Sequence, residues 1–212
     1  MQYSRFEDQL AKKIAEICQA HPDPSHDFLH VQRVVANAKH LAQHEGANLD
    51  VVIPAAYLHD FVMIAKNDPR RSQASRLSAE AAVQYLRELH YPEEHLQAIG
   101  HAIAAHSFSA AIAAETIEAK VVQDADRLDG LGAIGVARCF AMSGLLQRPF
   151  YHSQDPFCDQ RQANDHANTL DHFYVKLLKV PALLQTSSGR REGEKRLRFL
   201  ETFLSQLKEE LC

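Results

Sequence analysis

Residues 55–63 read AAYLHDFVM, and this stretch decides which fold and which kind of site the chain is able to form. Seven of its nine residues are apolar, yet His59 and Asp60 lie side by side in the middle. A segment this apolar is expected to be buried, and an unpaired buried carboxylate is strongly destabilising. Asp60 is therefore expected to have a partner inside the core, either a metal ion or a hydrogen bond from the neighbouring histidine.

The segments around this stretch have the periodicity of helices. Residues 26–46 repeat apolar side chains at helical spacing, and Gly46 is suited to end that helix. Residues 50–65 are apolar nearly all round, as is typical of a helix at the centre of a bundle. Strand-like alternation is absent, so the sequence predicts an all-α fold. Further helices are predicted at residues 4–20, 77–90, 92–107, 117–144, 165–180 and 189–211.

The domain organisation is predicted from length and from the lack of a linker. A chain of 212 residues is long enough for a full core, and no stretch rich in Pro, Gly and Ser separates two halves. We expect a single helical-bundle domain over residues 1–212. Its metal-binding core is expected at about 26–130, and the helices within 158–212 are expected to complete the pocket.

Composition limits the classes of partner and the compartment. The net charge is −4 and no block of like charges occurs, which argues against nucleic acid or a membrane surface as a partner. Four scattered cysteines without a CxxC pair indicate reduced thiols. The charged N-terminus lacks the pattern of a signal peptide, and no apolar run has the length of a membrane span. These features predict a soluble cytoplasmic protein, either a monomer or a homo-oligomer.

Two further residues are candidates to share a metal ion with His59 and Asp60. On one helix, those two neighbours point about 100° apart, so other helices must bring ligands to a common point. His30 lies at the edge of an apolar helix face, and Asp126 interrupts the apolar segment VVQDADRLDG. Two neutral imidazoles and two carboxylates carry two negative charges, which one divalent cation neutralises. Such nitrogen and oxygen ligands suit Mn, Fe, Co, Ni, Zn or Mg.

The order His30, His59-Asp60, Asp126 resembles the H…HD…D signature of the HD-domain metal-dependent phosphohydrolases. The phrases SHDFLHVQRVV, AAYLHDF, AIAAHSFS, VVQDADRLDGLGAIGVAR and DHFYVKLLK are similar to small bacterial members of that family of the YedJ type, over nearly the whole chain. The resemblance implies an all-helical core that holds one divalent metal ion with these four residues. It also implies hydrolysis of a phosphoester or phosphoanhydride bond, with relatives that act on nucleotides.

The last ligand is open between two aspartates. The phrase QDADRLD offers Asp124, Asp126 and Asp129, and the family typically shows its ligand in an A-D-x-L phrase, which matches Asp126. Asp124 is the alternative. On a helix it points elsewhere, where it is suited to accept the second N–H of a ligating imidazole.

His106, in the phrase AHSFS, is a candidate catalytic residue beside Asp60. We expect it to face the pocket and to contact the substrate phosphate or the leaving oxygen, with simple local packing as the alternative. Some HD enzymes bind a second metal ion through additional histidines, but His101 and His106 are five residues apart and share no helical face. One metal ion is therefore expected. Asp60 is expected to accept a proton from the attacking water.

The charge that develops on a transferring phosphoryl group requires cationic partners. Arg127 is the candidate for catalysis, and the candidates for substrate binding are Lys176, Arg190 and Arg191. The basic segment PRRSQASR, at residues 69–76, is a further candidate to close over the site as a phosphate-binding lid.

The predicted function is that of a metal-dependent phosphohydrolase for a nucleotide or another small phosphorylated metabolite, acting by attack of metal-bound water on phosphorus. Monoester, diester and pyrophosphate bonds are all compatible with this set of residues, so the bond stays open. The alternative is a catalytically weak HD domain that serves as a metal-stabilised ligand-binding or regulatory module. No GxxxxGKS or GxSxG phrase is present to support a different chemistry.

Overall fold

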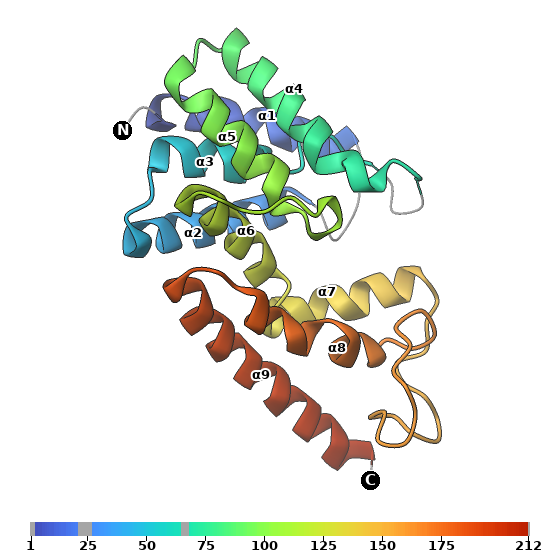
Figure 1. The fold of residues 1–212 in the computed structure, drawn as a ribbon. Coiled ribbons are helices and arrows are strands. Elements are labelled where there is room, and N and C mark those ends of the chain that lie inside the picture. Colours follow the sequence, from blue (N-terminus) through green and yellow to red (C-terminus); the bar gives the residue numbers. More distant parts are fainter. Residues whose placement is uncertain (1–2, 21–26, 65–67, 212) are drawn as a thin grey trace. The chain divides into compact units, whose positions relative to one another are not determined.

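The computed structural model describes residues 3–20, 27–64 and 68–211, and the regular elements in these ranges are all helices (Figure 1). This confirms the all-α prediction. The contacts divide the chain into two compact units: Met1–Asp126 with Gln185–Gly189, and Arg127–Leu184 with Arg190–Cys212. The single domain over 1–212 stays a prediction, and each unit is described by itself.

The first unit is built around one central helix. α3 (Leu49–Leu58) has α1, α2 and α5 packed around it (Figure 1). Every residue of α3 from Val51 to Leu58 is buried, as the continuous apolar character of this segment predicts. The other helices are α1 (Glu7–Ala20), α2 (Phe28–Glu45), α4 (Ala74–Glu88), α5 (Glu93–His106) and α6 (Ile117–Asp129, in this unit to Asp126). Three short 3-10 turns accompany them: η1 (Tyr3–Arg5), η2 (Arg71–Gln73) and η3 (Phe108–Ala110).

A proline inside α3 is accommodated by a side chain from another segment. Pro54 has no N–H, so the carbonyl of Asp50, four residues earlier, loses its helical donor. The hydroxyl of Tyr91 donates to that carbonyl at 2.7 Å. The central helix therefore keeps its backbone hydrogen bonding despite the proline.

The helix expected over residues 50–65 is shorter than predicted. α3 ends at Leu58, and His59 follows as its C-cap. The Nδ1 atom of the His59 ring bonds the carbonyl of Ala56 at 2.8 Å, which is the carbonyl that the next helical N–H would use. His59 and Asp60 thus leave the helix in a turn instead of lying 100° apart on one helix, and the expectation of a shared helix was wrong.

The prediction of one helix over residues 117–144 is also corrected. α6 ends at Asp129 and α7 (Gly132–Leu145) follows after a break at Gly130 and Leu131. Gly132 has a φ of +65°, a left-handed conformation that glycine adopts without steric cost. The break between α6 and α7 is therefore a glycine turn, and Gly135 packs against it, because a Cβ atom at Gly135 would overlap the backbone of Gly130.

The second unit holds α7, α8 (Asp171–Val175), η4 (Leu177–Leu183) and α9 (Ser187–Leu211, in this unit from Arg190). The helix predicted over 165–180 was correct only in part, since α8 has five residues. The segment before α8 is irregular. Its Arg161 binds the buried carboxylate of Asp171 through two hydrogen bonds of 2.6 and 2.7 Å.

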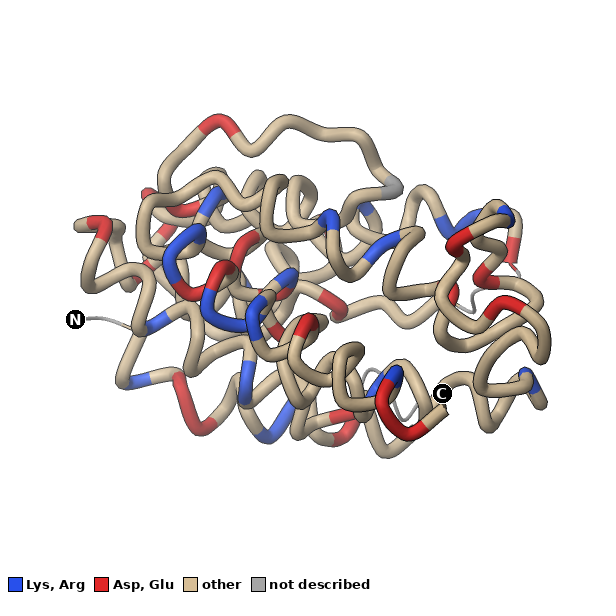
Figure 2. The backbone as a smooth tube through the Cα atoms, turned by 90° about the horizontal axis from the view of Figure 1, so that it is seen from below, with Lys and Arg blue, Asp and Glu red and all other residues tan. Residues whose placement is uncertain are grey.

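Acidic and basic residues are interspersed along the backbone in Figure 2. This distribution agrees with the absence of a block of like charges in the sequence. In the described part of the chain no single helix has both the length and the apolar character to cross a membrane. The two helices α6 and α7, joined at a bend, have the length and composition of a membrane span only when they are taken together.

Candidate metal centre

The four residues predicted as ligands come together within the first unit. His30 is the third residue of α2, His59 caps the end of α3, and Asp126 lies on α6. The N-cap of α2 is Asp27, whose carboxylate accepts the His30 N–H at 2.7 Å. The start of α2 is thereby fixed one turn before the imidazole that it presents.

The distances between donor atoms agree with those between ligands of one metal ion. The Nε2 atoms of His30 and His59 are 3.3 Å apart. Asp60 Oδ2 is 3.5 Å from the His59 Nε2, and Asp126 Oδ1 is 3.6 Å and 4.0 Å from the Nε2 atoms of His30 and His59. Ligand bonds of about 2.1 Å place neighbouring ligand atoms about 3.0–3.5 Å apart. The ligand atoms of His30, His59 and Asp60 all lie within 4.8 Å of one another, so these three residues form a group that could hold a divalent ion, with Asp126 beside the two imidazoles.

The His59 ring is held in the protonation state that a metal ligand needs. Its Nδ1 contacts the Ala56 carbonyl, which requires a proton on Nδ1 and leaves the lone pair of Nε2 directed at the other donors. Burial lowers the pKa of His59 and outweighs the opposing charge of Asp60. The imidazole is therefore neutral.

The two carboxylates are half-buried, with 18% of the Asp60 side chain and 30% of the Asp126 side chain exposed. Burial by itself raises the pKa of Asp126, but His59, His30 and His106 together lower it below its ordinary value. Asp126 is thus ionised among imidazoles. Its partial exposure leaves the centre accessible to solvent on one side.

His106 lies in the same cluster and presents the same local geometry as His59. It is the last residue of α5, and its Nδ1 bonds the Ile103 carbonyl at 2.7 Å. Its Nε2 is 3.6 Å from Asp60 Oδ1, and its ring lies edge-on to His59 at 5.0 Å. Burial lowers the pKa of His106, but the hydrogen bond and charge of Asp60 outweigh burial, so that the net pKa is raised.

Two amide side chains from α2 and α6 position Asp126. Gln123 Nε2 donates to the Ala105 carbonyl at 2.6 Å, one residue before His106. Asn37 Nδ2 donates to the Ala125 carbonyl at 3.3 Å. The sequence analysis did not predict either hydrogen bond. Asn and Gln are common on protein surfaces, and their partners on other helices become known only from the fold.

Asp124, the alternative last ligand, has a different set of partners. It is fully buried and accepts hydrogen bonds from the backbone N–H groups of Gln185 and Thr186 and from the Thr186 hydroxyl, at 2.8–3.1 Å. Asp124 therefore anchors the segment Gln185–Gly189, which belongs to the first unit. Asp126 is the aspartate that faces the histidines.

The structure places the remaining predicted residues elsewhere. His101 accepts the Glu115 N–H at 3.2 Å and is not part of the cluster. Arg127, Lys176, Arg190 and Arg191 belong to the second unit, so their catalytic and substrate-binding roles stay predictions. Within that unit Arg127 donates to the Leu183 carbonyl at 2.6 Å, and Arg190 donates to that of Leu184 at 3.0 Å.

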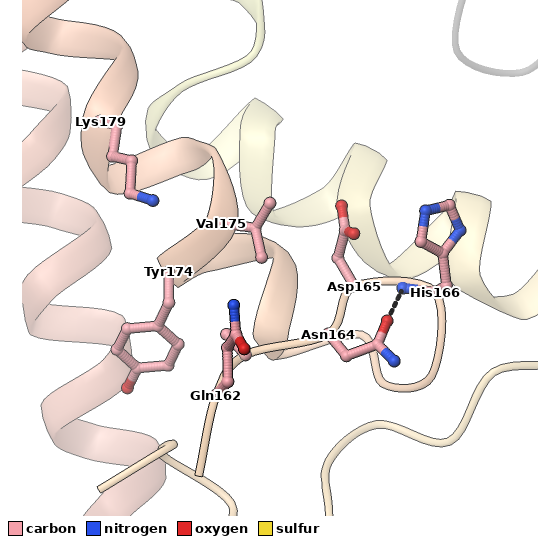
Figure 3. A pocket seen from close by; sticks show the side chains of 8 residues that line it. Gln162, Asn164, Asp165, His166, Tyr174, Val175 and Lys179 are labelled. Carbon is pink, nitrogen blue, oxygen red and sulfur yellow. Dashed lines mark hydrogen bonds between the residues drawn. The ribbon is translucent and has the colours of Figure 1, made fainter.

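The second unit has a hollow of about 730 Å³ of mixed polarity, shown in Figure 3. Asn164, His166, Tyr174 and Lys179 line it, and Asn164 accepts the His166 N–H at 3.1 Å. The carboxylate of Asp165, at its edge, binds His172 at 2.8 Å. None of the residues predicted for metal or substrate lines this hollow, and we assign it no part in the centre.

Comparison with known proteins gives consistent matches. The profile of the HD domain family matches residues 27–131. The chain is 32% identical to the uncharacterised protein YpgQ of Bacillus subtilis over 190 residues, which cover 88% of this chain and 84% of YpgQ.

Solved structures give the same relationship. An HD-superfamily hydrolase from Bacillus thuringiensis aligns with a TM-score of 0.77 and 32% identity, covering 99% of this chain and 98% of that one. B. subtilis YpgQ in complex with ADP aligns with a TM-score of 0.77 and 28% identity, covering 99% and 97%. The YedJ-type grouping within the family stays a prediction. The H…HD…D cluster, the helical fold and these matches together show that the chain belongs to the HD domain family.

Proposed function

We propose that the chain is a metal-dependent phosphohydrolase whose substrate is a nucleotide. The observation that carries this proposal is the convergence of His30, His59, Asp60 and Asp126 from separate segments on one point. The chain's membership of the HD domain family supports hydrolysis, and the ADP complex of the similar protein YpgQ supports a nucleotide.

The four residues would hold one divalent ion, of Mn, Fe, Co, Ni, Zn or Mg. When bound, such an ion acidifies water and polarises a phosphoryl oxygen. The chain itself supplies the proton path. Asp60 would accept the proton of a water molecule that attacks phosphorus and pass it to His106, whose Nε2 is 3.6 Å from the Asp60 Oδ1.

His106 would complete the reaction by protonating the leaving oxygen through Nε2. The P–O bond to the leaving group breaks, the hydroxyl of water stays on phosphorus, and the proton passes from Asp60 to His106 and on to the departing oxygen. The contact between Nδ1 and the Ile103 carbonyl orients the ring for this transfer.

A hydrolysis screen of the full chain tests the proposal. Purified protein is loaded with each candidate metal ion in turn and incubated with nucleoside mono-, di- and triphosphates, and products are identified by phosphorus NMR. We expect turnover with at least one nucleotide. Orthophosphate as the product indicates a terminal phosphate bond, and pyrophosphate indicates an internal phosphoanhydride bond.

Variants make the screen specific. His59→Gln and Asp60→Asn are expected to lower kcat/KM by at least about a thousandfold, since each removes a metal ligand. His101→Gln is the matched control, because the His101 ring bonds the Glu115 backbone outside the cluster. A protein that binds metal and hydrolyses no phosphorylated compound contradicts the proposal and favours the regulatory module.

A further inference from the structure

We infer that the 3-10 turns η2 and η3 form the nucleotide-recognition rim of the metal centre. In this rim, Arg71 binds the phosphate chain and Phe108 packs against the base. The inference rests on the proposed function, because it states how the same centre selects a nucleotide among phosphorylated compounds.

The two turns lie against each other and next to the end of α5. η2 packs against η3, and both contact α4. Phe108 follows His106 by two residues, so their Cα atoms are within about 7 Å of each other. The Ser75 hydroxyl donates to the Ala104 carbonyl at 2.9 Å, which ties the start of α4 to the last turn of α5. The rim is therefore built beside the residue that contacts Asp60.

Arg71 is also tied to the segment that leaves the centre. Its Nη1 donates to the carbonyl of Ile64 at 2.9 Å. Ile64 follows Asp60 by four residues, which limits their separation to about 14 Å. The Arg71 guanidinium is therefore fixed to a chain segment that begins at the metal centre, and we expect a phosphate chain that extends from the metal to reach it.

Arg71 differs from its neighbour in the charge that it meets. Arg70 binds the carboxylate of Asp68 at 2.9 Å. No carboxylate contacts the Arg71 guanidinium within the ranges that the structure describes, and the one hydrogen-bond partner of that guanidinium there is a neutral carbonyl. A guanidinium has five N–H donors, so four are left for the oxygens of a phosphate.

The charge balance of the centre calls for such a cation. Asp60 and Asp126 together offset one divalent ion, so the charge of a phosphate chain has to be met from outside the ligand set. In the predicted basic segment 69–76, Arg71 is an arginine that a neighbouring carbonyl holds in place and that no described carboxylate neutralises. The phosphate-binding role predicted for segment 69–76 is therefore assigned to the side chain of Arg71.

Phe108 supplies an apolar surface for a base. Its exposed fraction of 77% is the highest among the large apolar side chains of the described residues. A lone exposed aromatic is common on protein surfaces. Phe108, however, begins the turn that packs against the turn of Arg71, so the ring and the guanidinium belong to one rim. Stacking on an aromatic ring tightens the binding of a base about 5- to 150-fold.

Equilibrium binding separates the two roles. The probes are α,β-methylene-ADP and methylene diphosphonate, two diphosphate analogues that differ by the nucleoside. Each is titrated by calorimetry into the full chain in the presence of Mg²⁺. We expect Phe108→Ala to weaken the nucleotide analogue about tenfold and to leave the diphosphonate unchanged, while Phe108→Trp retains both. Arg71→Ala is expected to weaken both probes at least about tenfold.

The matched controls change an arginine and a phenylalanine that are not part of the rim. Arg87→Ala removes an exposed arginine at the other end of α4, and Phe150→Ala removes an exposed phenylalanine of the second unit; both are expected to bind like the wild type. Unchanged binding by Phe108→Ala and Arg71→Ala, at wild-type melting temperature, overturns the inference. The inference is also overturned if the wild-type protein binds neither probe. If that protein still hydrolyses a simple aryl phosphate, the proposed hydrolase function stands while the rim inference fails.

Discussion

At the scale of single residues, one device recurs at the centre. His59 and His106 each end a helix, and each ring uses Nδ1 to bond the carbonyl three residues earlier. The contact ends the helix and also directs Nε2 into the cluster. The carbonyl ends of α3 and α5 carry partial negative charge, which favours a cation nearby. His59 and His106 therefore end their helices and also direct a ring nitrogen toward the candidate metal centre.

Asp126 and Asp124 are expected to respond differently to the same substitution. Asp126→Asn removes a charged ligand, and metal affinity is expected to fall more than about 100-fold. Asp124→Asn weakens the anchor of the segment Gln185–Gly189, so unfolding free energy is expected to fall by about 1–3 kcal/mol while metal affinity changes only a few-fold. Metal titration by calorimetry and urea unfolding provide the two readouts. Equal losses of affinity in both variants contradict this assignment.

At the scale of elements, the first turn of α9 is fitted to Asp124. Thr186 precedes the helix, donates its hydroxyl to Asp124, and accepts the Gly189 N–H at 3.0 Å. This arrangement leaves no space at Gly189. A Cβ atom there lies 2.4 Å from Asp124 Oδ2 and 2.6 Å from Thr186 Oγ1. The glycine is needed because the capping groups occupy the volume of a side chain.

Gly189→Ala is accordingly expected to destabilise the protein by about 1–3 kcal/mol, since a capping group must move or the first helical turn must shift. Gly144→Ala is the matched control in α7, where no atom lies within 4 Å of the added Cβ. That change is expected to be neutral or to stabilise by up to about 1 kcal/mol. Thermal unfolding followed by far-ultraviolet circular dichroism measures both, and a neutral Gly189→Ala disproves the tight fit.

At the scale of the whole molecule, the two units depend on different interactions. The first unit has a cluster of titratable groups in which a bound cation would offset the negative charges of Asp60 and Asp126. The second unit is held by aromatic contacts and by a buried ion pair. Phe173 and Phe203 stack at 5.7 Å, and Arg161 binds Asp171. Changes in solution conditions are therefore expected to affect the units differently.

Removal of metal is expected to loosen the first unit selectively. Without a cation, Asp60 and Asp126 repel each other across the cluster, and a ligand that binds only the folded state no longer stabilises it. Hydrogen exchange measured by mass spectrometry, with and without a chelator, is expected to accelerate at the start of α2 and the ends of α3 and α5. Peptides from α7 and the part of α9 after Gly189 provide the internal control. Uniform or absent acceleration is the contrary result.

Acid is expected to act on the second unit through Asp171. Burial raises the pKa of Asp171, but the hydrogen bonds and charge of Arg161 and the Asn164 N–H outweigh it, so the pKa is lowered. Because the folded pKa lies below the unfolded value of about 4, the pair stabilises the protein at neutral pH. That contribution is lost as the pH falls below about 4 and through the folded pKa.

Asp171→Asn tests this contribution. The variant is expected to lose about 3–5 kcal/mol at pH 7, since Arg161 is left without its buried partner. Its unfolding free energy is also expected to depend less on pH below about 4 than that of the wild type. Urea unfolding at a series of pH values gives both slopes, and parallel slopes show that another carboxylate controls the acid response.

Much of the fold and of the candidate metal cluster was predictable because both rest on local patterns. Apolar residues at helical spacing defined α2, α4 and α5, and Gly46 ended α2 in a left-handed conformation with φ of 68°. The resemblance of the H…HD…D order selected residues that the structure brings together, each with a donor atom within 4.0 Å of the His59 Nε2. The ends of α3 and α6 were not predictable, because they depend on a ring-to-carbonyl bond and on a glycine turn.

The sequence by itself thus determined that the chain is helical, that Asp60 needs a partner in an apolar core, and which residues are able to provide one. Only the tertiary structure decided which aspartate of the phrase QDADRLD faces the histidines, since Asp124 and Asp126 differ in what their side of α6 meets. It also decided that Arg71 lies by the turn of Phe108. Local periodicity is set by neighbours in the chain, whereas the partner of a polar side chain is set by segments that meet only after folding.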